Sequence, residues 1–190
     1  VTTVLSATKD MTHLHAWRKR IGAEKAQQIT TESANIGTVM HNSLEKHVKG
    51  IDRTPGSNLI QQKAWGMANV IIENGLNDVS EVWGSEVSLY YPELYAGTTD
   101  LVGVYKGEPA IMDFKQARRL KKKEWVEDYY LQLVAYSEAH NKQYGTKIKS
   151  GRMFICTQAN EYQSFEIENY DHWVGQWYSK LEEYYKKVLY

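Results

Sequence analysis

Two aspartates and a lysine stand close together in the middle of the chain. Asp100 lies in one apolar run, and Asp113 and Lys115 end the next, within the segment GTTDLVGVYKGEPAIMDFK. Side chains alternate along a strand, so Asp113 and Lys115 are expected to point to the same face. Two converging carboxylates can hold a divalent cation, and a lysine beside the cation stabilises charge on a phosphate. This combination suits the hydrolysis of phosphodiester bonds.

The residues around these three predict a β-hairpin. A turn-like Lys-Gly pair separates two short apolar runs, residues 100–105 and 108–114. In an antiparallel hairpin, Asp100 and Asp113 would lie roughly opposite each other, where like charges are destabilising unless a cation lies between them. The alternative is a surface hairpin with two solvated acids. The acid-x-Lys triplet alone does not decide between the two, because it also arises by chance.

The composition predicts one globular domain without a cysteine-based centre. The 190 residues are 42% hydrophobic and 24% charged, with a formal net charge of zero, which argues against a protein that coats DNA through bulk charge. The single cysteine, Cys156, excludes an internal disulfide and a cysteine-ligated iron–sulfur cluster. The sequence contains neither an apolar run long enough for a membrane span nor a signal-peptide layout, so we expect an intracellular protein with no membrane contact.

Hydrophobic periodicity predicts an α/β fold with a central mixed β-sheet of about five strands, flanked by helices, and a helical N-terminal part. Helices are expected at residues 11–21, 23–49 with a break near Gly37, 57–75, 124–144 and 169–190. Strands are expected at residues 79–91, in the hairpin, and at residues 148–157 and 161–167. We expect a single domain, residues 1–190, with a helical part at 1–77 and a sheet core at 78–190.

Two of the expected helices carry polar pairs at i, i+4 spacing. His41 and Glu45 share one helix face, with Gly37 one turn earlier, and Gln132 and Tyr136 share another. Each pair alone is more typical of an ordinary helix surface than of a ligand set. Together with the two acids and the lysine, in this order along the chain, they form a much more specific set.

With these residues in place, the chain resembles the PD-(D/E)xK nucleases of the RecB-like branch. The resemblance rests on GxxxHxxxE from Gly37, GxxD ending at Asp100, DxK from Asp113 and QxxxY from Gln132. Within that branch the chain is most similar to the mitochondrial genome maintenance exonucleases and their phage-encoded relatives. This implies a restriction-endonuclease-like core, a role in DNA repair or recombination, and a location in a host cytoplasm or the mitochondrial matrix.

The resemblance also implies a role for each motif residue. The cofactor would be Mg²⁺ or Mn²⁺, bound by His41, Asp100, Asp113 and the backbone carbonyl of Phe114. Lys115 would position or activate the attacking water, and Gln132 would orient the lysine or contact DNA. Supporting roles fall to Glu45, Glu86 and Tyr136, with Glu86 ranked below the others. Gln116 stands where the family often has a hydroxyl residue, which removes that contact but not the metal site.

A basic tract without acids begins directly after the lysine and consists of Arg118, Arg119, Lys121, Lys122 and Lys123. Because a polyanion would have to lie at the proposed site, we expect this tract to bind DNA phosphates. The function implied is a monomeric, metal-dependent exonuclease acting on single-stranded DNA ends, with the N-terminal helices arching over the site. A catalytically inactive nucleic-acid-binding module and a structure-specific endonuclease are the alternatives.

Overall fold

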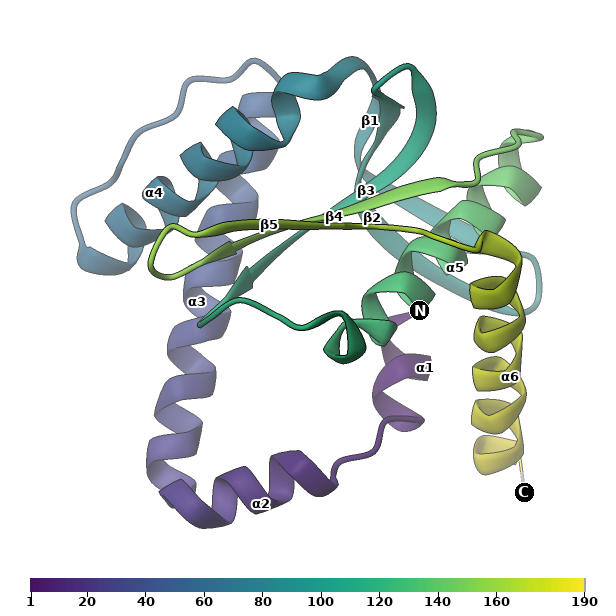
Figure 1. Cartoon of the computed structure of the whole chain (residues 1–190), viewed down its shortest axis with the longest axis horizontal. Helices are drawn as coiled ribbons and strands as arrows, with labels where there is room; N and C mark the ends of the chain where they lie inside the picture. The colour runs from purple at the N-terminus through teal and green to yellow at the C-terminus, as the bar shows by residue number, and fades with distance from the viewer. Residues whose placement is uncertain (190) are drawn as a thin grey trace.

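A five-stranded sheet between two layers of helices forms the centre of the protein, as a computed structural model that describes residues 1–189 shows (Figure 1). The sheet order follows the chain, and every neighbouring pair is antiparallel except β3 and β4, which are parallel. The strands are β1 (Val79–Tyr91), β2 (Tyr95–Tyr105), β3 (Glu108–Ala117), β4 (Ser150–Thr157) and β5 (Tyr162–Glu166). The predicted mixed sheet of about five strands is therefore confirmed.

Within residues 1–189, six α-helices accompany this sheet. They are α1 (Thr2–Ala7), α2 (Thr12–Ile21), α3 (Ala23–Val48), α4 (Leu59–Asn74), α5 (Glu127–Tyr144) and α6 (Tyr170–Leu189). A capping box between Asn58 and Gln61 fixes the start of α4, and Gly145 ends α5 in the left-handed conformation at φ 69°. Short 3₁₀ turns, η1 (Leu76–Asp78) and η2 (Lys123–Trp125), precede β1 and α5.

Each face of the sheet has its own hydrophobic core. Leu101 and Met112 pack with α3 and α4 on one face, whereas Val102 and Ile111 pack with α1, α5 and α6 on the other. The strict alternation along β2 and β3 follows from the pleat of a strand. Because both faces are covered, the ends of these central strands are held firmly between α3 on one side and α5 on the other.

The hairpin of β2 and β3 has the predicted register. Tyr105 pairs with Glu108 at the turn and Leu101 pairs with Met112 further along. The turn residues Lys106 and Gly107 have φ values of 49° and 84°, as expected for a two-residue hairpin turn that matches the strand twist. One step beyond the pair of Leu101 and Met112, the register brings the two aspartates opposite each other.

Two expectations about the helices were wrong. Helix α3 is continuous through Gly37, because a glycine costs a long, well-packed helix only about 1 kcal/mol. At this point α3 faces β3, and a Cβ on Gly37 would make an ordinary van der Waals contact of 3.5 Å with Cγ of Gln116. Helix α1 was not expected, and its six residues are held by packing of Val4 and Leu5 into the core rather than by a side-chain cap.

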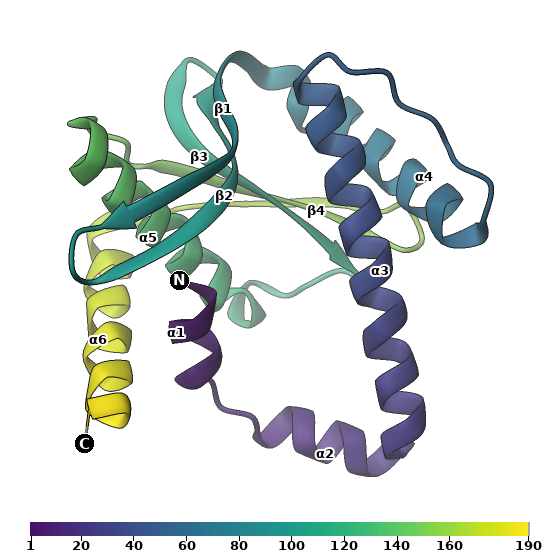
Figure 2. The ribbon, with the colours of Figure 1, turned by 180° about the vertical axis from the view of Figure 1, so that it is seen from behind.

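The N-terminal helices extend away from the sheet. Figures 1 and 2 show α1, α2 and the first half of α3 joined in a curve that faces the connection between β3 and α5. Among the described residues, no helix combines the length and the apolar character needed to cross a bilayer.

Candidate metal centre

Asp100 and Asp113 form the centre of the site and are tied to each other through the backbone. The amide of Asp100 donates a hydrogen bond of 3.1 Å to Oδ1 of Asp113, and the amide of Phe114 donates one of 2.7 Å to Oδ2 of Asp100. Only 3% of the Asp113 side chain and 11% of the Asp100 side chain are exposed. The hairpin therefore holds two buried carboxylates together, as the sequence predicted.

Lys115 lies on the same side of β3 as Asp113. Its Nζ donates a hydrogen bond of 2.9 Å to Oδ2 of Asp113 and lies 5.9 Å from the ring centre of Tyr129 on α5. Burial disfavours the ammonium form, but attraction to Asp113 outweighs burial and raises the pKa of Lys115 above its usual range. Its ammonium form is therefore favoured, and that form can donate hydrogen bonds to a phosphate or to a water.

A cluster of three possible metal ligands lies beside this pair. His41, Glu86 and Asp100 each offer one ligand atom, and these three atoms lie within 4.8 Å of one another. His41 reaches the cluster from α3, and its Nδ1 lies 3.1 Å from Oδ1 of Asp100. Glu86 reaches it from β1, the strand next to β2. The sequence ranked Glu86 low because a single acid in a strand carries no spacing signal; only the pairing of β1 with β2 places it here.

The backbone at Glu86 is unusual. Its φ is 51°, in the left-handed region that a side chain other than glycine, asparagine or aspartate rarely adopts. Such a conformation costs of order 1–3 kcal/mol and persists where the surroundings impose it, often at functional sites. Here it lies opposite Asp100, between the paired residues Ser85 and Val87, at the point where the carboxylate joins the cluster.

The acids of the cluster repel one another. Burial and the charge of Asp113 raise the pKa of Asp100, and burial with the charges of Asp100 and Glu45 raises the pKa of Glu86. Burial opposes the charged form of His41, yet its hydrogen bond and attraction to Asp100 raise its pKa overall. Besides burial, negative charge from neighbouring carboxylates contributes to all three shifts, and a cation would neutralise that charge.

The donor set fits a divalent cation of the Mg²⁺ or Mn²⁺ kind. Two carboxylates supply hard oxygen ligands and one imidazole supplies nitrogen, and the imidazole favours Mn²⁺ over Mg²⁺. Asp113 is not one of the three clustered ligands, and its two oxygens accept hydrogen bonds from the Asp100 amide and from Lys115. Its assignment as a ligand stays a prediction, as does that of the Phe114 carbonyl.

Gln132 and Tyr136 lie on the α5 side of the site. Gln132 is buried and donates a hydrogen bond of 3.3 Å to the Tyr136 hydroxyl. Among the described residues it makes no bond to Lys115, so its predicted contact with the lysine is not present in this arrangement. Burial and the charge of Asp113 raise the pKa of Tyr136 to about 12, which keeps its hydroxyl protonated. Gly97 gives this ring room, since a Cβ there would lie 2.8 Å from Cε1 of Tyr136.

The cluster opens into a cavity of about 570 Å³ between α3 and the sheet. Glu45 lines this cavity and forms an ion pair with Lys49. Gln116, the residue in place of the family hydroxyl, also lines it and is reached by Gln158 at 3.5 Å. The cavity leaves space for a substrate beside the proposed ligands.

Part of the basic tract lines a cavity, and part of it lies at the exposed surface. Arg119 and Lys121 line a second cavity, of about 1130 Å³, together with Lys9 and with Trp17 from α2. Trp125 completes the opposite wall, and Lys122 lies 5.2 Å from its ring centre. Arg118 is exposed, and Lys123 pairs with Glu168 at the surface. Sequence reasoning missed the two tryptophans, because nothing in their spacing indicates that they meet across one cavity.

Comparison with known proteins supports the fold. The sequence matches no family model and no curated protein. Among solved structures, the "Putative exonuclease" from Eubacterium rectale has a TM-score of 0.57 and 14% identity, over 81% of this chain and 66% of that one, just under two thirds of its length. The alkaline exonuclease LHK-Exo from Laribacter hongkongensis has a TM-score of 0.37 and 11% identity, over 78% of this chain and 77% of that one. That second similarity is too low to support a conclusion, whereas the first shows that the chain has the fold of the Eubacterium rectale protein.

Proposed function

We propose that this protein is a metal-dependent deoxyribonuclease that hydrolyses phosphodiester bonds from the ends of single-stranded DNA. The observation that carries the proposal is the cluster of His41, Glu86 and Asp100 directly beside the ion pair of Lys115 and Asp113. A ligand set for a divalent cation lies beside an ammonium group here. This arrangement suits phosphodiester hydrolysis better than it suits any other common reaction. Residues 1–190 act in this proposal as one nuclease domain.

His41, Glu86 and Asp100 would hold the cation, which when bound lowers the pKa of water and polarises a phosphoryl oxygen. The ammonium of Lys115, held by Asp113, donates hydrogen bonds to the phosphate and to the attacking water, and it stabilises the charge that develops. The raised pKa of Lys115 favours its ammonium form, so its proposed part is to position the attacking water and to neutralise charge on the phosphate. Tyr129 and Asp113 restrict the position of the lysine.

The preference for single strands is supported by the larger cavity. It is bounded by α1 and α2 on one side and by the connection between β3 and α5 on the other, and it carries both cations and tryptophans. Cations that follow a phosphate backbone and aromatic rings on which bases stack are typical of single-strand binding. A passage of this kind accepts a free strand end more readily than a duplex.

The test uses a single-stranded oligonucleotide labelled at either end, with Mg²⁺, Mn²⁺ or chelator. We expect metal-dependent release of short products from one labelled end and no cutting of a closed circular strand. Lys115→Ala should reduce turnover by at least a hundredfold while DNA binding changes little, and Lys142→Ala, on α5, serves as a charge-matched control. Normal turnover by Lys115→Ala would refute the proposal. Rapid cutting of the circle would indicate an endonuclease, and binding without any cutting would indicate an inactive module.

A further inference from the structure

A small polar pocket lies on the other side of α3 from the candidate metal centre. It has a volume of about 230 Å³ and is formed by α3, the start of α4 and the loop that joins them. Asn42 lines both this pocket and the cavity of the metal centre, so the two are neighbours. The side chains that matter here are Asn42, Ser43, Lys46, Arg53 and Trp65.

Arg53 is the central group of the pocket. Its Nε donates a hydrogen bond of 3.0 Å to Ser43, and its Nη2 donates one of 2.9 Å to Asn69. The guanidinium stacks on Trp65, with Cζ 4.3 Å from the ring centre. A guanidinium has five N–H donors, and these bonds use two of them. The arginine is therefore fixed in one orientation with donors to spare.

No carboxylate balances this arginine within residues 1–189. Its partners are a hydroxyl, an amide and an aromatic ring, all neutral. Burial lowers the pKa of Arg53, and burial together with the charge of Arg53 lowers the pKa of His47. Lys46 adds a second cation to the pocket wall. A fixed, half-buried guanidinium beside a lysine and an open cavity is an anion site, and its fork geometry suits a phosphate.

The position on α3 relates this pocket to the metal centre. Lys46 follows His41 by five residues, which corresponds to about 140° around the helix and about 7.5 Å along it. A strand leaving the metal centre would cross the exposed side of α3 at Asn42 and reach Lys46 and Arg53. We propose that this pocket, formed by Lys46, Arg53, Ser43 and Asn42, binds one phosphate group of the DNA strand that is being cut. The inference rests on the proposed nuclease function.

The phosphate can be an internal one or the terminal phosphate of the strand, and the chemistry is the same for both. The site shares no residue with the larger cavity, which Arg119 and Lys121 of the basic tract line. A phosphate held at each of these two places would fix the strand at two points.

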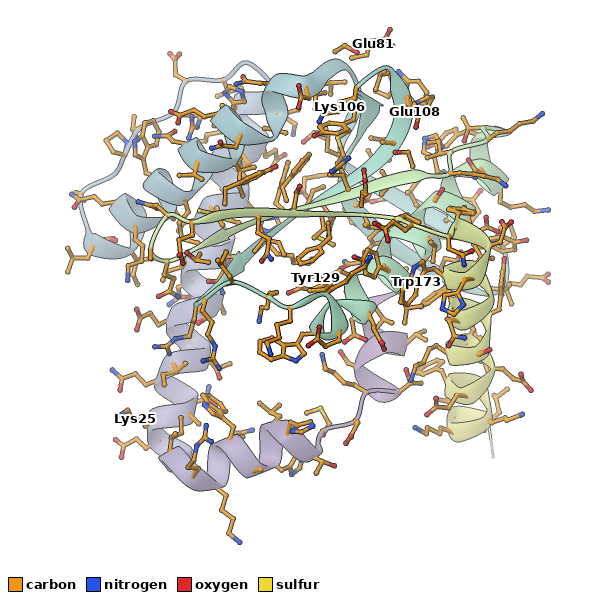
Figure 3. The ribbon with its side chains drawn as sticks, viewed as in Figure 1. Lys25, Glu81, Lys106, Glu108, Tyr129 and Trp173 are labelled. Carbon is orange, nitrogen blue, oxygen red and sulfur yellow. The ribbon has the colours of Figure 1, made fainter. Side chains whose placement is uncertain are left out.

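The experiment compares Lys46→Ala with Lys25→Ala. Lys25 lies on the same helix and, as Figure 3 shows, near its far end. With a single-stranded substrate and Mn²⁺, we expect Lys46→Ala to raise KM roughly three- to tenfold with kcat within about twofold, and to reduce the salt slope of binding by about 0.7 to 1, while Lys25→Ala changes neither. Arg53→Lys keeps the charge but loses the fork, and it should raise KM in the same direction.

A scan with single methylphosphonate linkages identifies the phosphate. If the phosphate is internal, a neutral linkage at one position should raise the KM of the wild type as much as Lys46→Ala does, and should raise the KM of the variant no further. If the phosphate is terminal, Lys46→Ala should raise KM only for strands that carry a phosphate at that end. Two outcomes would overturn this inference and leave the nuclease proposal intact. In the first, the wild type cuts DNA and Lys46→Ala behaves like Lys25→Ala. In the second, no single neutral linkage reproduces the loss seen in Lys46→Ala. If the wild type cuts nothing, the nuclease proposal fails instead, and metal-free binding of the same strands by the two variants still tests the pocket.

Discussion

Asp100 and Asp113 lie on neighbouring strands with the amide of one bonded to the carboxylate of the other at 3.1 Å. Burial and the charge of Asp113 raise the pKa of Asp100, so a bound cation would stabilise this arrangement of the hairpin. The metal centre is thus a place where stability, charge and the proposed catalysis can be measured together.

Cation binding should raise thermal stability. At a Mn²⁺ concentration of about one hundred times Kd, we expect the free energy of unfolding to rise by about 2.7 kcal/mol, because only the folded state brings the ligands together. Asp100→Asn removes one ligand charge and should abolish this gain, while relief of repulsion leaves the metal-free protein at least as stable. Thermal unfolding with and without Mn²⁺ measures both effects. An unchanged Mn²⁺ response in Asp100→Asn would exclude Asp100 as a ligand.

The strained backbone of Glu86 gives a second prediction. Glu86→Gly should stabilise the metal-free protein by about 1 kcal/mol, because glycine adopts φ 51° without strain and the repulsion from Asp100 disappears. The same change should weaken Mn²⁺ binding, which calorimetry measures. Glu93, in the β1–β2 turn with φ 65°, is the control: Glu93→Gly relieves comparable strain but should leave Mn²⁺ binding unchanged. Equal metal affinity in the two variants would remove Glu86 from the site.

Metal affinity should rise with pH, and the rise should continue to a higher pH than it would with an ordinary histidine. Only neutral imidazole binds a cation, so protons compete with the metal. Because Asp100 raises the pKa of His41 above its usual 6.5, that competition continues past pH 6.5 and ends only above the raised pKa. Mn²⁺ titrations between about pH 6 and 8.5 follow this change. In His41→Gln the affinity should be lower, and its dependence on pH in this range should be much weaker; a dependence equal to that of the wild type would contradict the assignment.

Trp125 should contribute to the binding of single strands. Trp125→Ala is expected to weaken single-stranded DNA binding by about 1–3 kcal/mol, because base stacking on its exposed ring would be lost. The matched control is Trp83→Ala, which removes a tryptophan of similar exposure from β1, outside the larger cavity. Fluorescence anisotropy with a labelled strand and no metal measures binding without cleavage. The same loss in both variants would indicate a nonspecific effect.

Gly97 should be intolerant of a side chain. Gly97→Ala places a Cβ 2.8 Å from Tyr136 and 3.3 Å from Cγ2 of Val1, so we expect a loss of about 1–3 kcal/mol in unfolding free energy. Gly175→Ala in α6 meets nothing within 4 Å and should stabilise the protein by about 0.5–1 kcal/mol. Chemical denaturation of both variants checks the difference. If Gly97→Ala is neutral, the close packing of Tyr136 on β2 is not needed.

The sequence predicted the parts of the site that depend on local pattern. The alternation around Asp100 and Asp113 gave the hairpin and its register, and i, i+4 spacing gave the faces of His41 and Gln132. Residues whose partners are distant in sequence were ranked low, as Glu86 was, or missed, as Arg53 was. Glu86 depends on strand pairing and an unusual φ, and Arg53 depends on Trp65 and Asn69 from the next helix. Neither relationship has a period that a sequence reveals.

Helix α3 also has a mechanical consequence. His41 and Lys46 belong to one uninterrupted helix of 26 residues, so the distance between the metal centre and the polar pocket is set by helix geometry and not by a flexible loop. The helix therefore fixes the spacing between these two groups. Any tilt of α3 would carry both groups together, whereas a single residue inserted between them would rotate one by about 100° against the other. The separation between a held phosphate and the bond to be cut would then be a fixed property of the backbone.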